Sequence, residues 1–91
     1  NTSDYTMTLN SQKSIISTAK DKSGKTSVFR TIINLKLQLK QNEKLIKERN
    51  FSSSFTYNNS ENNHDLLQYQ RTIEINLTNK IFEEIIIFLS T

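Results

Sequence analysis

A stretch of alternating side chains in the first half of the sequence constrains the fold most. Apolar or hydroxylated residues take every odd position: Phe29, Thr31, Ile33, Leu35, Leu37 and Leu39. Mostly polar residues take the even positions: Arg30, Asn34, Lys36, Gln38 and Lys40. Successive side chains of a strand point to opposite faces of its sheet, so a period of two predicts a strand with one buried face. We expect this strand to cover residues 26–41.

Two further segments provide neighbours for this strand. Tyr5-Thr-Met-Thr-Leu9 also alternates and begins a strand expected at about residues 3–18, which a charged tip, Lys20 to Lys25, joins to the central strand. The turn Gln41-Asn-Glu-Lys44 leads into a returning strand at about 44–57. Pairing Leu35 with Phe51 and Thr31 with Phe55 brings the apolar rows to one face. The sequence therefore predicts a three-stranded antiparallel meander.

The last third of the chain is expected to be a helix over about residues 62–90. Asn62 with Asp65 three positions later resembles a capping box. Apolar residues then recur at helical spacing: Leu66, Ile73, Leu77, Ile81, Ile85 and Phe88. The β-branched run Ile85-Ile-Ile87 leaves a final strand as the competing interpretation. The predicted fold class is α+β, with the meander packed against one long C-terminal helix.

A second apolar stripe on this helix lies nearly opposite the first. It consists of Ile75, Phe82 and Ile86, with Leu89 beside them. One sheet face cannot cover both stripes. We therefore expect Ile75, Phe82 and Ile86 to contact a partner or another segment of the protein.

Composition argues against an enzyme. The 91 residues suit a single domain, 1–91, and they include no Cys, no Pro and one Gly. This composition excludes disulfide scaffolds, thiolate metal sites and the usual glycine-rich phosphate loops. His64 stands alone, and Glu83 and Glu84 are adjacent and diverge on a helix. We expect no catalytic residues, no metal site and no cofactor.

Charge is distributed unevenly along the chain. Residues 1–50 carry ten Lys or Arg against four acids, whereas residues 51–91 carry two against five. The basic residues of the predicted sheet are Lys13, Lys20, Lys22, Lys25, Arg30, Lys36 and Lys40. They form either an ordinary solvated face or an attractive surface for phosphate-bearing partners such as anionic lipid or nucleic acid. Lysine suits variable phosphate geometry because it acts as a compact point charge.

The order of elements and several short motifs resemble a known family. The tip Lys20 to Lys25 leads into Thr26-Ser-Val-Phe-Arg-Thr-Ile-Ile33. A turn and strand then run into Asn50-Phe-Ser-Ser-Ser-Phe-Thr-Tyr-Asn58, and a helix with Asp65-Leu-Leu-Gln-Tyr-Gln-Arg71 follows. This arrangement is similar to the C-terminal two-thirds of the lipopolysaccharide-assembly lipoproteins of the LptE family, formerly rare lipoprotein B, and most of all to alphaproteobacterial members.

The resemblance implies a fold and a function. The family fold is a four-stranded mixed sheet with two helices on one face, so one strand and one helix would precede Asn1. A family member is a lipoprotein at the periplasmic face of the outer membrane, anchored by lipid through a segment not present in this sequence. It supports or plugs the LptD β-barrel and binds lipopolysaccharide.

The resemblance also assigns the family's basic positions to residues of this sequence. The basic hairpin-tip position matches Lys22, with Lys20 and Lys25 beside it, and Arg30 is a supporting candidate. A second basic position of the family corresponds to about Ser60 or Glu61.

The alternative function is a small basic nucleic-acid-binding sheet, which requires exposed aromatic rings interleaved with cations. Here Phe29, Phe51, Phe55 and Tyr57 share their predicted face with leucines. Packing in the core is therefore the expected role of the rings, and no nucleic-acid partner is expected.

Overall fold

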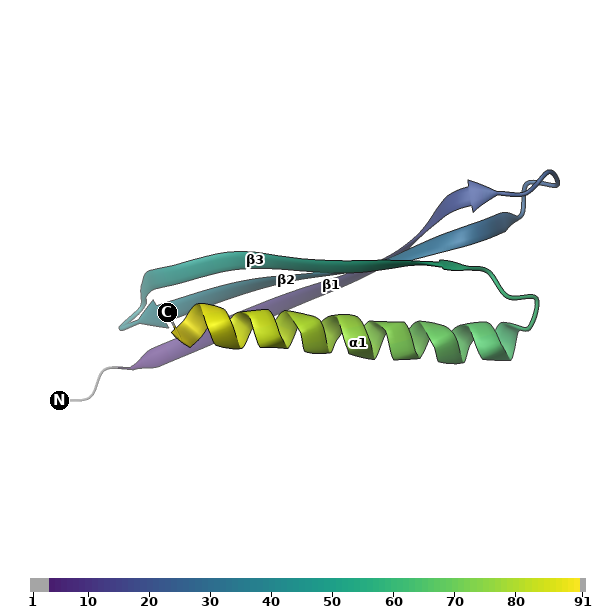
Figure 1. The fold of residues 1–91 in the computed structure, drawn as a ribbon. Helices are drawn as coiled ribbons and strands as arrows, with labels where there is room; N and C mark the ends of the chain where they lie inside the picture. The colour runs from purple at the N-terminus through teal and green to yellow at the C-terminus, as the bar shows by residue number, and fades with distance from the viewer. Residues whose placement is uncertain (1–3, 91) are drawn as a thin grey trace.

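The computed structural model describes residues 4–90 and has an α+β fold of two layers. Three strands, β1 (Tyr5–Lys20), β2 (Thr26–Gln41) and β3 (Lys44–Asn58), form an antiparallel sheet in the order β1-β2-β3. The helix α1 (Asn63–Ser90) packs on one face of this sheet (Figure 1). The predicted fold class is thus confirmed, including helix rather than strand at Ile85–Ile87. The first strand runs to Lys20, two residues further than expected, and its expected start at Ser3 lies outside the described residues.

The register of β2 and β3 agrees with the alternating pattern. Leu35 pairs with Phe51 and Thr31 with Phe55. A two-residue turn joins the strands, with Asn42 and Glu43 at φ values of 52° and 68°. Positive φ at both central residues belongs to the tight turn whose twist matches that of the flanking strands. The turn pairs Gln41 with Lys44, and a one-residue register shift between Leu39 and Lys40 then brings the apolar rows of β2 and β3 to the same face.

The core lies between this face and the first helical stripe. Its buried members are Ile33, Leu35, Leu37, Phe51 and Tyr57 from the sheet, and Ile73, Leu77, Ile81 and Ile85 from the helix. Leu37 and Ile81 are fully buried, with 0% of their surface exposed. Leu66 and Phe88 pack against the core near the two ends of α1. Every member of the predicted first stripe therefore faces the sheet.

Phe55 departs from the prediction that it packs in the core. Its register places it on the helix side of the sheet, yet 47% of its surface is exposed. It borders a hollow of about 230 Å³ together with Tyr69 and Thr72 of α1. Because β3 is an edge strand, the single helix covers this position only from one side. The pattern of alternation identifies the face of a strand but not how much of that face is covered.

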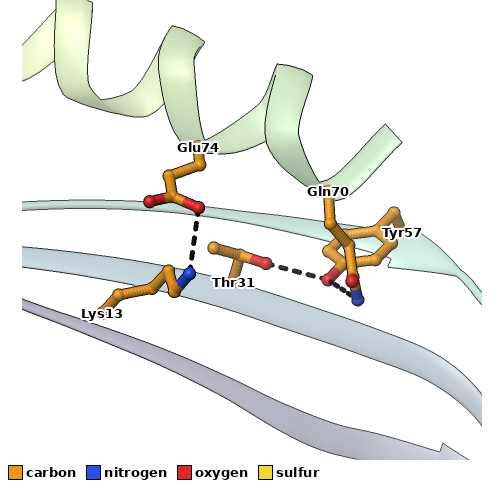
Figure 2. A network of polar contacts seen from close by, with 5 residues as sticks. All are labelled: Lys13, Thr31, Tyr57, Gln70 and Glu74. Atoms are coloured by element: carbon orange, nitrogen blue, oxygen red, sulfur yellow. Dashed lines mark hydrogen bonds and ion pairs between the residues drawn. The ribbon is translucent and has the colours of Figure 1, made fainter. Parts of the chain in front are cut away.

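A polar network lies at one end of the core. The hydroxyls of Thr31 and Tyr57 are 2.8 Å apart, and Gln70 donates its side-chain N–H to the Tyr57 oxygen at 3.0 Å (Figure 2). Thr31 is 1% exposed. A buried hydroxyl without a partner costs about 1–3 kcal/mol. Tyr57 therefore allows Thr31 to occupy an apolar row without that penalty.

The two ends of α1 have different stabilising contacts. At the N-terminus, the Asn62 side-chain oxygen accepts the N–H groups of His64 and Asp65 at 3.0 and 3.2 Å, as expected for an N-cap. At the C-terminus the last turn carries no basic residue of its own. Instead, Lys47 and Arg49 of β3 lie over the Phe88 ring, 5.4 and 5.2 Å from its centre. These cations also complement the negative end of the helix dipole.

Candidate functional site

The hairpin between β1 and β2 forms a compact, hydrogen-bonded tip. One Asp21 carboxylate oxygen accepts three bonds, from the Ser23 and Lys25 backbone N–H groups at 2.9 and 3.0 Å and from the Ser23 hydroxyl at 2.7 Å. The Asp21 backbone also bonds Gly24 and Lys25. Gly24 has a φ of +87°, which a residue with a side chain rarely adopts. The five residues 21–25 are therefore tied together around one carboxylate.

These bonds keep the carboxylate ionised. The side-chain bond from Ser23 is the largest cause that lowers the pKa of Asp21 below its ordinary 3.8, followed by the backbone bond from Lys25. Hydrogen bonds donated to the charged form stabilise that form. At neutral pH the tip thus contains one fixed negative charge around which its lysines are arranged.

The tip brings together three of the four candidate cations. Lys20, Lys22 and Lys25 lie at or beside the turn and are exposed. In Figure 1 the β1–β2 hairpin twists away from α1 and extends past the start of the helix, so these lysines lie at one extremity of a molecule 65 Å long. Arg30 lies further along β2, where its Nε donates to the Thr56 hydroxyl at 3.2 Å. Arg30 therefore belongs to the sheet face rather than to the tip.

A small hollow lies between the tip and the loop that precedes α1. Its volume is about 180 Å³, and it is lined by Asp21, Lys25, Thr26, Ser27, Asn59, Ser60 and Glu61. Asn59 joins the loop to β2 by bonds to the carbonyls of Ser27 and Thr26 at 2.9 and 2.8 Å. Ser60 and Glu61 are the residues at which the sequence resemblance implies a second basic position. In this chain the hollow has two acids beside one lysine, so it is a poorer anion site than the outer side of the tip.

The second helical stripe is open to solvent. Ile75, Phe82 and Ile86 are 60%, 44% and 64% exposed. Ile75 lines a hollow of about 490 Å³ with Arg71, Glu74, Thr78 and Asn79. In the part of the chain that the structure describes, nothing covers these side chains.

An apolar row on β1 was not recognised from the sequence as uncovered. Tyr5, Met7, Leu9 and Ile15 pair with β2 residues of the core-facing row and so point to the helix side of the sheet. They remain 63%, 49%, 39% and 42% exposed because α1 lies over β2 and β3. Three strands spaced about 4.8 Å apart form a sheet that is wider than one helix, since helices pack 8–10 Å apart. The predicted fold therefore already implied that one helix would leave part of the sheet uncovered.

Lys13 lies apart from the other basic residues of the sheet, with which it was predicted to form one surface. It pairs with Ile33 and therefore lies on the helix side, where its Nζ reaches the Glu74 carboxylate at 3.1 Å (Figure 2). Both side chains are about half exposed, at 47% and 41%. An ion pair of this exposure contributes about 0.2–1 kcal/mol. Lys13 therefore links β1 to the helix rather than extending the anion-attracting surface.

The aromatic side chains gather on the helix side of the sheet. Phe29, Phe51, Phe55 and Tyr57 all lie in core-facing rows, and Phe29 and Tyr57 stack with their ring centres 5.9 Å apart. Over residues 4–90, no ring lies on the outer face beside Arg30, Lys36 and Lys40. That face consequently offers no platform on which nucleic-acid bases could stack.

Two other features are absent from residues 4–90. These residues contain no group of three His, Cys, Asp or Glu side chains placed to hold a metal ion. Within the same range, no helix is both long and apolar enough to cross a membrane. No protein-family model matches the sequence, and no curated protein matches it either.

Proposed function

We propose that this protein is a non-enzymatic binding and assembly module of the lipopolysaccharide-assembly type, which binds lipopolysaccharide phosphates at its hairpin tip. The observation that carries the proposal is the tip itself: three exposed lysines on a turn organised by Asp21, projecting beyond the helix. The resemblance to the LptE family supports the same assignment.

The proposed mechanism is attraction without covalent chemistry. Lys20, Lys22 and Lys25 give the tip three positive charges against the single negative charge of Asp21. Lysine ammonium groups on flexible stems adapt to phosphates of variable position. The hydrogen-bonded turn keeps the stems anchored close together, so ordering the tip costs little on binding. Such binding weakens as salt screens the charges.

The proposed partner surface comprises two uncovered apolar regions, together called the uncovered strip. It consists of the β1 row Tyr5, Met7, Leu9 and Ile15 with the helical stripe Ile75, Phe82 and Ile86. In the LptE-like fold a second helix lies on this side of the sheet, and an LptD-type barrel surrounds the lipoprotein at the periplasmic face of the outer membrane. Either contact would remove from water the apolar area that this chain leaves exposed.

The lipid role is tested by replacing Lys20, Lys22 and Lys25 with Ser. We expect binding to purified lipopolysaccharide to weaken by about tenfold or more, since each lysine near an anionic surface contributes roughly 1 kcal/mol. Because the three side chains are exposed, the circular dichroism spectrum and unfolding midpoint should stay close to those of the parent.

A matched control removes the same charge elsewhere. Replacing Lys40, Lys44 and Lys80 with Ser also lowers the net charge from +3 to 0 but leaves the tip intact. Because the proposed site is the tip, we expect this control to bind lipopolysaccharide within about threefold of the parent. Nonspecific attraction alone depends on net charge and would weaken binding by the two triple variants equally. Equal losses in the two triple variants would remove the lipid role of the tip. Tight binding of single-stranded RNA by the parent would instead favour the nucleic-acid alternative.

A further inference from the structure

The outer face of the sheet, opposite α1, has a shallow hollow that the hairpin-tip function does not use. Its volume is about 490 Å³, within the range of small-molecule sites. All three strands contribute polar side chains to it: Asn10 and Gln12 from β1, Asn34 and Lys36 from β2, and Asn50 and Ser52 from β3. Leu35 and Phe51, whose side chains are buried in the core, complete the lining.

The six polar side chains form a regular grid. Asn10, Lys36 and Asn50 pair across the three strands, and Gln12, Asn34 and Ser52 form the adjacent row. Strands lie about 4.8 Å apart, and successive residues on one face of a strand lie about 7 Å apart. The grid therefore presents polar groups on two parallel lines, close enough for one small ligand to touch both.

The amides of this grid have unused hydrogen-bonding capacity. Asn10, Gln12, Asn34 and Asn50 are exposed, and their side chains form no hydrogen bond with any other residue in 4–90. Each primary amide offers two donors and one acceptor oxygen. Vicinal hydroxyl groups, which also donate and accept, are the chemical complement of such a surface.

Charge and shape narrow the class of ligand. Lys36 supplies a positive charge inside the grid, and it forms a long ion pair of 3.9 Å with Glu48, which does not line the hollow. The same face carries no aromatic ring among the described residues, so base stacking does not contribute. A ligand rich in hydroxyls and bearing one anionic group satisfies both the amides and the lysine.

From these observations we infer that the outer-face hollow binds an acidic saccharide. The amides of Asn10, Asn34 and Asn50 bond its hydroxyls, and Lys36 holds its anionic group. Asn34 lies eight residues along β2 from Thr26, or about 26 Å from the tip hairpin. The saccharide site can therefore be tested independently of the lipid role of the tip. A free acidic glycan and the glycan part of a lipid-linked saccharide share this chemistry.

The test is an NMR titration of the full chain with trigalacturonic acid, using the neutral maltotriose as the control ligand. We expect saturable shifts of the side-chain amide signals of Asn10, Gln12, Asn34 and Asn50 with the acidic sugar. Maltotriose should bind about fivefold more weakly, because it lacks the group that Lys36 contacts. Absence of saturable shifts, or shifts confined to residues 20–25, would overturn the inference.

Two substitutions on the same face sharpen the test. Lys36→Gln should weaken trigalacturonic acid binding by about fivefold, whereas Lys40→Gln, outside the grid, should change it by less than about twofold. Equal effects of the two would show nonspecific attraction and overturn the site. Repeating the titration with lipopolysaccharide separates the two sources: shifts of the grid amides with both ligands support a lipid-linked glycan, and shifts with trigalacturonic acid alone support a free one.

Discussion

Asp21 organises the hairpin tip, although it carries the wrong charge for the proposed ligand. Its carboxylate accepts bonds from Ser23 and Lys25, and the positive φ of Gly24 lets the chain close around it. Without this acid the tip would carry one more net positive charge, but the turn that gathers the lysines would lose three hydrogen bonds. In the proposed function, Asp21 therefore reduces the electrostatic attraction of the tip but gives it a defined geometry.

The Asp21 bonds predict a local acid transition. Because the folded-state pKa of Asp21 lies below its ordinary 3.8, the ionised form stabilises the tip above that value, and this contribution is lost as the pH falls through the lowered pKa. We expect the Ser23 and Lys25 amide signals to move together with the Asp21 carboxyl signal in an NMR titration below pH 3.8. Ser23→Ala should raise the pKa of Asp21 toward its ordinary value, since the Ser23 side chain is the largest cause of the shift. A midpoint at or above 3.8 in the parent would contradict the hydrogen-bond arrangement.

At the scale of elements, periodicity predicted nearly everything about the fold. The odd-numbered row of β2, the pairing of Leu35 with Phe51 and the helical stripe ending at Phe88 all lie where the pattern placed them. These features depend on local geometry, namely the alternation of a strand and the turn of a helix. The remaining freedom, the register, is set by the Asn42-Glu43 turn together with the one-residue shift between Leu39 and Lys40.

The candidate site was predictable only in part. The tip lysines were identified because a turn sequence is local, whereas the position of Lys13 beside Glu74 depends on how a helix 61 residues later crosses the sheet. The exposure of Phe55 and the grid around Asn34 likewise depend on which strands the helix covers and how all three align. No periodicity within one segment contains that information.

The helix offers a matched pair of substitutions that measures the importance of its two faces. Ile81→Ala removes a fully buried side chain and should lower the free energy of unfolding by about 2–5 kcal/mol. Ile86→Ala makes the same chemical change at a residue that is 64% exposed and should alter it by less than about 0.5 kcal/mol. Urea denaturation followed by circular dichroism gives both values. Comparable losses in the two variants would mean that the second stripe is packed in solution, contrary to its exposure.

At the scale of the whole molecule, the single helix is too narrow to cover the three-stranded sheet. The backbone of α1 lies over β2 and β3, and the Lys13–Glu74 ion pair reaches from β1 to the helix. All sixteen residues of β1 are exposed, and its apolar row lies uncovered on the inner face. The β1 row and the second helical stripe are both left uncovered, and a partner or a second helix could cover either of them.

This uneven coverage predicts that β1 opens before the rest of the sheet. β1 and β3 are both edge strands bonded to β2, but only β3 also packs against the helix. Local opening of β1 exposes little additional apolar surface, because its side chains are already accessible. By hydrogen exchange, we expect β1 amides bonded to β2 to exchange at least about tenfold faster than the corresponding β3 amides, a difference of about 1.4 kcal/mol in opening free energy. Binding of a partner to the uncovered strip should slow exchange in β1 selectively. Equal protection of β1 and β3 in the isolated chain would show that β1 is stabilised by contacts other than its bonds to β2.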